Sequence, residues 1–83
     1  MKFGETLKNL RDINLFQDAV DKCTSDVILR SVDGSEEFNL KSVISRFVAI
    51  GRLCEEYGDW YEVFCTDKNE EGFMLQFFHE IKN

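Results

Sequence analysis

The chain has 83 residues, the size of one small domain, and its 16 acidic residues against 10 basic ones give a formal net charge of −6. Nucleic acid and anionic membranes are disfavoured as partners, because both repel an acidic surface. A hydrophobic content of 43% and the lack of proline argue against disorder, so we expect a single domain over residues 1–83.

The three cysteines include no CxxC pair. An odd number disfavours a disulfide framework, and the chain has too few cysteine and histidine residues in suitable spacing for a zinc site. We expect buried thiols at Cys23, Cys54 and Cys65, with no metal and no cofactor.

Charges interrupt every apolar stretch, so no membrane span or signal-peptide core is expected, and the predicted compartment is the cytoplasm.

The N-terminal part of the chain predicts a short strand followed by a helix. Phe3 and Leu7 fall on one face of residues 1–7, as in a strand. Asn9 and Asp12 then form a variant capping box, which marks a helix start. The apolar residues after it recur at the spacing of an amphipathic helix of about 14 residues; they are Leu10, Ile13, Phe16, Val20 and Cys23.

A hairpin is predicted next. Residues 26–32 are rich in β-branched side chains, and residues 35–40 return as a second strand with Phe38 and Leu40 on one face. Asp33-Gly34 between them is a strong turn signal, since glycine tolerates a positive φ. The two glutamates of the second strand indicate an edge exposed to water.

The C-terminal half predicts two further helices around one strand. Ser42 is suited to cap a helix that carries Val43, Ile44, Phe47, Val48 and Ile50. Gly51 is a possible end of this helix, and a continuation through residues 52–54 is the alternative. Residues 55–59 are expected to form a loop and residues 60–65 a strand. After a turn at 66–69, with Asp67 or Asn69 as cap, a last helix buries Met74, Phe77, Phe78 and Ile81.

The predicted order is therefore β-α-β-β-α-β-α. Short connections and amphipathic helices favour an α+β domain, with an antiparallel sheet covered by helices on one face.

Known catalytic motifs are missing from the sequence. It holds no nucleotide-binding glycine loop, no GxSxG and no HExxH. His79 is the single histidine, and its place in the last helix, beside the most apolar stripe, predicts a half-exposed surface residue. We therefore expect no enzyme activity. One weaker candidate is an anion site, in which Arg11 and the helix start at Asn9 would hold a phosphate-like group.

Residues 9–51 resemble HPr, the phosphocarrier protein of the bacterial sugar phosphotransferase system. The similarity is carried by residues 24–29, Thr-Ser-Asp-Val-Ile-Leu, and by residues 38–44, Phe-Asn-Leu-Lys-Ser-Val-Ile, with a glycine turn between them. The resemblance implies an open-faced sandwich with a four-stranded antiparallel sheet. It also places Asn9 where HPr carries its phosphorylated histidine, and an amide cannot take over that reaction.

The resemblance implies two more sites. Ser42 is similar to the serine that a regulatory kinase phosphorylates in some HPr proteins, although a helix cap would also explain it. The helix after it is similar to the partner-binding helix of HPr, which suggests contacts through Val43, Ile44 and Phe47 with Lys41 and Arg46 at the rim. The alternative is that these apolar residues face the core.

The expected function is a non-catalytic, HPr-like protein that binds or regulates a protein partner, such as a component of the phosphotransferase system. One alternative is a phosphocarrier or serine phosphoacceptor that acts through Ser42. Another is a structural subunit that self-associates through its edge strand, where Phe38 would join a neighbouring sheet.

Overall fold

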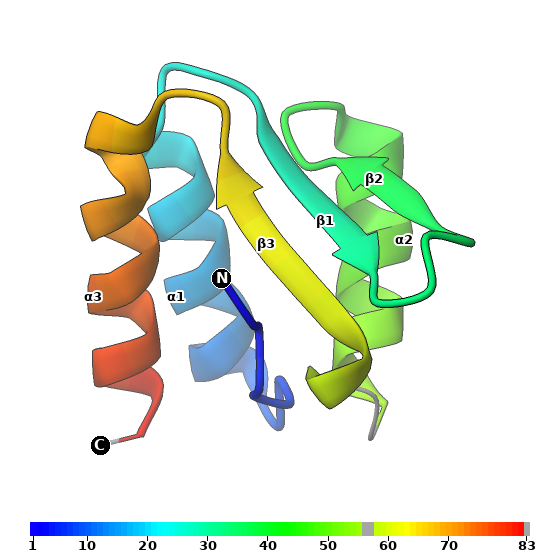
Figure 1. The fold of residues 1–83 in the computed structure, drawn as a ribbon. Helices are drawn as coiled ribbons and strands as arrows, with labels where there is room; N and C mark the ends of the chain where they lie inside the picture. The colour runs from blue at the N-terminus through cyan, green and yellow to red at the C-terminus, as the bar shows by residue number, and fades with distance from the viewer. Residues whose placement is uncertain (56–57, 83) are drawn as a thin grey trace.

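Three antiparallel strands, in the order β2-β1-β3, form the sheet of the computed structural model, which describes residues 1–55 and 58–82. The strands are β1 (Val27–Ser31), β2 (Glu37–Asn39) and β3 (Tyr61–Cys65). The helices are α1 (Leu10–Lys22), α2 (Val43–Cys54) and α3 (Glu71–Ile81), with two short 3-10 turns, η1 (Gly58–Trp60) and η2 (Lys68–Glu70). Figure 1 shows α1 and α3 side by side, and α2 behind β2.

The helices cover one face of the sheet, as the sequence predicted. In the central pair, Leu29 lies opposite Val63, and both are buried. Their neighbours Arg30 and Glu62 also pair, but they are exposed on the other face. This alternation gives the sheet one buried face and one solvent-exposed face, as is common for antiparallel sheets.

The prediction of a four-stranded, HPr-like sandwich is wrong. Residues 1–7 form no strand of the sheet, and Lys2 makes only an isolated bridge with Glu62. Gly4 has a φ of 65°, a left-handed conformation that turns the chain away from β3 after Phe3 has donated to the Tyr61 carbonyl at 2.9 Å. The fold is therefore α+β with a three-stranded sheet.

The N-terminal segment nevertheless belongs to the core. Phe3 is buried, and its ring centroid lies 5.7 Å from that of Phe16 and 5.9 Å from that of Phe77. These distances are typical of aromatic pairs in protein interiors. The segment thus packs between α1 and α3 and joins the two helices to the sheet.

Local helix signals are confirmed with small shifts. The Asn9 side chain accepts the Asp12 backbone N–H at 3.0 Å, while Asp12 accepts from the Lys8 N–H at 3.0 Å instead of from Asn9. Leu10 is exposed instead of buried. Of the two ends considered for α2, the later one is correct, because the helix passes Gly51 and continues to Cys54. Asp67 caps η2 and not α3.

Further corrections concern the hairpin, the loop after α2 and the cysteines. The second hairpin strand is shorter than predicted, because β2 spans only Glu37–Asn39. Residues 56–57 of the predicted loop lie outside the described residues, and η1 occupies 58–60. Cys23 and Cys65 are buried as predicted, but Cys54 is exposed. Among residues 1–55 and 58–82, no helix is long and apolar enough to cross a membrane.

Candidate functional site

The outer side of α2 carries large apolar side chains in contact with water. Val43, Ile44, Phe47 and Val48 are 69%, 78%, 67% and 45% exposed. They follow one another at helical spacing, so they lie on one side, while Ala49, Ile50 and Leu53 on the other side are buried. We name these four exposed residues the α2 apolar face. The structure thus turns Val43, Ile44 and Phe47 outward, and Val48 extends the surface that the sequence suggested.

A groove of about 280 Å³ runs along the α2 apolar face where α2 meets α1, and it is lined by Gln17, Asp21, Val43, Arg46 and Phe47. Arg46, one of these lining residues, makes two contacts within the protein. The guanidinium contacts the Asp21 carboxylate at 2.8 Å and donates to the Leu40 carbonyl at 2.7 Å. Only 16% of the Arg46 side chain is exposed, and these two contacts fix its position in the lining of the groove.

Lys41 has a structural contact that the sequence did not reveal. Its ammonium donates to the Val20 carbonyl at 3.0 Å and to the Cys23 carbonyl at 2.6 Å. These carbonyls belong to the last turn of α1, where a cation also favours the helix dipole. Lys41 therefore joins α1 to the start of α2, instead of standing free at the rim.

Ser42 precedes α2 and is exposed. It has the extended backbone of an N-cap residue, but its side chain makes no capping hydrogen bond. The backbone N–H instead donates to the Asn39 carbonyl at 3.0 Å. The capping role expected for the hydroxyl is therefore absent, and the phosphorylation of Ser42 stays a prediction.

The groups of the predicted anion site are engaged within the protein. The side-chain amide oxygen of Asn9 accepts the Asp12 N–H at 3.0 Å. The Arg11 guanidinium donates to the Glu80 carbonyl at 3.1 Å and lies 3.5 Å from the Asp12 carboxylate. An anion would have to displace these contacts and approach Asp12.

His79 lies in the last turn of α3 and is exposed, so it is a surface residue as expected.

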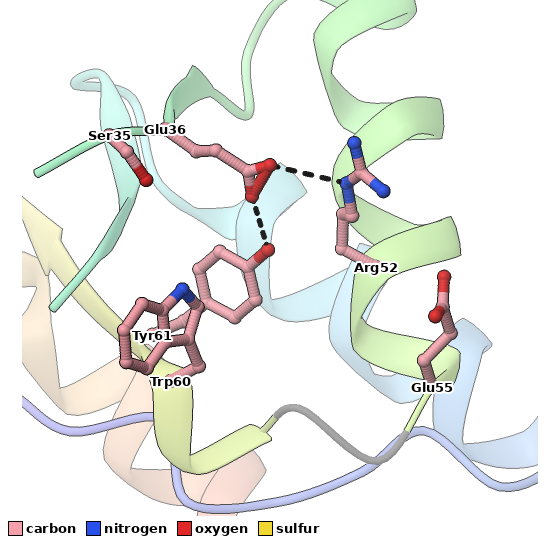
Figure 2. Close-up of a pocket in the computed structure, with 6 residues that line it drawn as sticks. All are labelled: Ser35, Glu36, Arg52, Glu55, Trp60 and Tyr61. Carbon is pink, nitrogen blue, oxygen red and sulfur yellow. Dashed lines mark hydrogen bonds and ion pairs between the residues drawn. The ribbon is translucent and has the colours of Figure 1, made fainter. Parts of the chain in front are cut away.

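A second hollow, which the sequence did not predict, lies at the other end of α2. This cleft of about 440 Å³ is lined by Ser35, Glu36, Arg52, Glu55, Trp60 and Tyr61 (Figure 2). The lining comes from the β1–β2 turn, the end of α2 and the junction of η1 with β3. No sequence motif joins these three segments, and the pairing of Ser31 with Tyr61 in the sheet brings two of them together.

A row of side chains joined by one hydrogen bond and one ion pair crosses the cleft. The Tyr61 hydroxyl donates to the Glu36 carboxylate at 2.6 Å, and the Arg52 Nε lies 3.4 Å from the other Glu36 oxygen. Figure 2 shows Glu36 reaching from the hairpin toward both partners. Burial and the Glu36 contact raise the pKa of Tyr61 to about 12, so the phenol stays a neutral donor.

Comparison with known proteins finds no family model, no curated protein and no solved structure that matches this chain. The resemblance to HPr therefore rests on the sequence segments alone. Within residues 1–55 and 58–82, no group of three or more acidic, cysteine or histidine side chains is placed to hold a metal ion.

Proposed function

We propose that this protein is a cytoplasmic binding protein that contacts a protein partner through the α2 apolar face. The observation that carries the proposal is the exposure of Ile44 and Phe47, at 78% and 67%. Burying the exposed part of such a side chain gains on the order of 1–2 kcal/mol. Contiguous apolar side chains with a polar rim mark interaction sites on small proteins.

The shape of the surface supports a protein as the partner. The α2 apolar face lies on a helix, and the groove beside Phe47 has room for one large apolar side chain. Asp21, 61% exposed, stands at the edge of this groove and would meet a basic residue of the partner. The cytoplasmic location is supported by Cys23 and Cys65, whose sulfur atoms lie 3.8 Å apart as free thiols.

The experiment compares affinity capture by the protein and by Ile44→Ser/Phe47→Ser from extracts of the cells that make it. The expected result is a protein that the wild type retains and that the double variant loses at least tenfold. Leu75→Ser is the matched control, since Leu75 is 57% exposed on α3, away from the α2 apolar face. Circular dichroism verifies the fold of each variant. Equal recovery by wild type and double variant would refute the proposal.

A second candidate function is phosphate acceptance at Ser42. The observation that favours it is the exposed hydroxyl, which makes no capping bond at the start of a 12-residue helix. A phosphate there would meet free backbone N–H groups and the positive end of the helix dipole. Incubation with ATP and a serine kinase is expected to label the protein and not Ser42→Ala. Label that persists in Ser42→Ala would contradict it.

Self-association through the edge strand has less support. The Leu40 N–H donates to the Val27 carbonyl, and the Glu36 carbonyl accepts from Ser31, so these groups point toward β1. By alternation, Glu37 and Asn39 present the outward groups of β2, and the Asn39 carbonyl already accepts from Ser42. Phe38 packs against the core. The edge thus offers very few backbone groups for pairing with a second chain.

A further inference from the structure

The cleft at the end of α2 has an excess of negative charge. Arg52 approaches Glu36 at 3.4 Å and offsets its charge. Glu55 is exposed at the C-terminus of α2, and among the described residues its carboxylate makes no hydrogen bond or ion pair. Two carboxylates against one guanidinium, in a chain with a net charge of −6, favour a cation over an anion here.

An aromatic wall completes the cleft. Trp60 is 45% exposed and lines it, and it lies on the Tyr61 side in Figure 2, while Arg52 and Glu55 lie on the α2 side. An exposed indole attracts organic cations through its electron-rich face. A bare metal ion fits less well, because both Glu36 oxygens already have partners and few other oxygen ligands surround it.

We propose that this cleft binds an organic ammonium compound, whose charged group pairs with Glu55 and whose carbon chain reaches across the cleft to the indole of Trp60. The group has two sources, a small free amine or the side chain of a lysine in a peptide. This site is separate from the α2 apolar face, and its occupation does not depend on the protein partner proposed above.

Trp60 is the single tryptophan of the chain, so its fluorescence reports on this cleft alone. Titration with n-butylammonium chloride is expected to shift or quench the emission with saturation. Potassium chloride at the same ionic strength and n-butanol are the controls for charge screening and for apolar contact. A parallel titration with Nα-acetyl-lysine methylamide separates the sources, because tighter binding of this probe indicates a lysine side chain and tighter binding of butylammonium a free amine.

Substitutions of the charged residues test the proposed site, because each is expected to change the affinity for butylammonium in a known direction. Glu55→Gln is expected to weaken butylammonium binding by up to about fivefold, the range of an exposed ion pair. Arg52→Gln is expected to strengthen it, since it removes the opposing cation. Glu62→Gln is the matched control, because it removes an equal charge from the open face of the sheet and leaves the cleft intact.

Three outcomes would overturn the proposal. The first is a fluorescence response to butylammonium no larger than that to potassium chloride. The second is equal binding by the wild type and Glu55→Gln. The third is weaker binding of butylammonium by Arg52→Gln, which would show that the bound group does not lie where the Arg52 charge opposes it. Because the probe is a small amine, none of these outcomes bears on the α2 apolar face.

Discussion

The Glu70 carboxylate binds Ser25 through the serine's backbone N–H, at 2.9 Å, and through its hydroxyl. The second oxygen binds Thr24 in the same two ways, with the backbone N–H at 2.7 Å and the hydroxyl at 3.0 Å. Glu70 stands directly before α3, and Thr24 and Ser25 follow α1. One carboxylate therefore fastens the loop after α1 to the start of α3.

The contact of Glu70 with Thr24 and Ser25 predicts how the stability of the folded protein depends on pH. The hydrogen bonds from Ser25 and Thr24 lower the pKa of Glu70 from 4.5 to about 2. A carboxyl group whose pKa is lowered by folding stabilises the folded state above its unfolded pKa, and this contribution is lost as the pH falls through the folded value. We expect the contribution to be complete above pH ~4.5 and to disappear toward pH ~2. A carboxyl titration by NMR should give a midpoint near 2 for Glu70.

Variants isolate the part played by the hydrogen bonds. Glu70→Gln should be less stable to urea than the wild type at neutral pH, and this difference should shrink as the pH falls. Glu71→Gln is the matched control, because it removes a charge from the same helix end one residue along. An equal loss of stability in both variants would show that helix-dipole charge, and not the contact with the loop after α1, dominates.

Phe3 predicts that the N-terminal segment is required for stability although it forms no strand. Its ring lies 5.4 Å from Phe78 and close to Phe16 and Phe77, and it is buried. Phe3→Ala should cost about 3–5 kcal/mol in urea unfolding, a large share of the roughly 5–15 kcal/mol that stabilises a small domain. Phe47→Ala is the control and should change stability by less than about 1 kcal/mol, since Phe47 is exposed. Similar losses of stability in Phe3→Ala and Phe47→Ala would contradict the placement of Phe3 in the core.

The sequence predicted the structure correctly where an element is determined by residues close together in the chain. The start of α1 followed from Asn9 and Asp12, which sit within one helical turn and bond each other directly. The same reasoning failed at residues 1–7, because strand formation there depends on distant partners. Gly4 turns the chain, and its N–H donates to the Gly58 carbonyl at 3.2 Å, a contact that no short window of sequence contains.

The α2 apolar face could be predicted from the sequence in part, and the cleft at the end of α2 could not, because both depend on contacts between distant residues. α2 is apolar on both sides, so sequence named Phe47 but could not decide whether it faces water; the packing of Leu53 against the core decides it. The cleft was not predictable at all. The Tyr61 to Glu36 hydrogen bond, which crosses it, joins residues 25 positions apart in the chain.

Two glycines predict opposite effects of the same substitution. A Cβ atom at Gly58 would lie 2.1 Å from the Glu5 carbonyl oxygen, whereas one at Gly51 would meet nothing within 4 Å. Gly58→Ala should therefore destabilise the protein by about 1–3 kcal/mol, since the backbone must move. Gly51→Ala should stabilise it by up to about 1 kcal/mol, because alanine is the better helix former. Urea unfolding of both variants measures this, and a stabilised Gly58→Ala would contradict the close approach of residues 5 and 58.

The three cysteines predict a stepwise reaction with a thiol reagent. Cys54 is exposed, whereas Cys23 and Cys65 are buried. Burial raises the pKa of Cys23, and it raises the pKa of Cys65 to about 12, so their reactive thiolate forms are scarce at neutral pH. The folded protein should therefore release one equivalent of dye promptly from dithionitrobenzoate, and all three thiols should react in denaturant. Cys54→Ser should abolish the prompt phase. If a prompt phase remains in Cys54→Ser, then the ends of α1 and β3, which hold Cys23 and Cys65, open on the timescale of the assay.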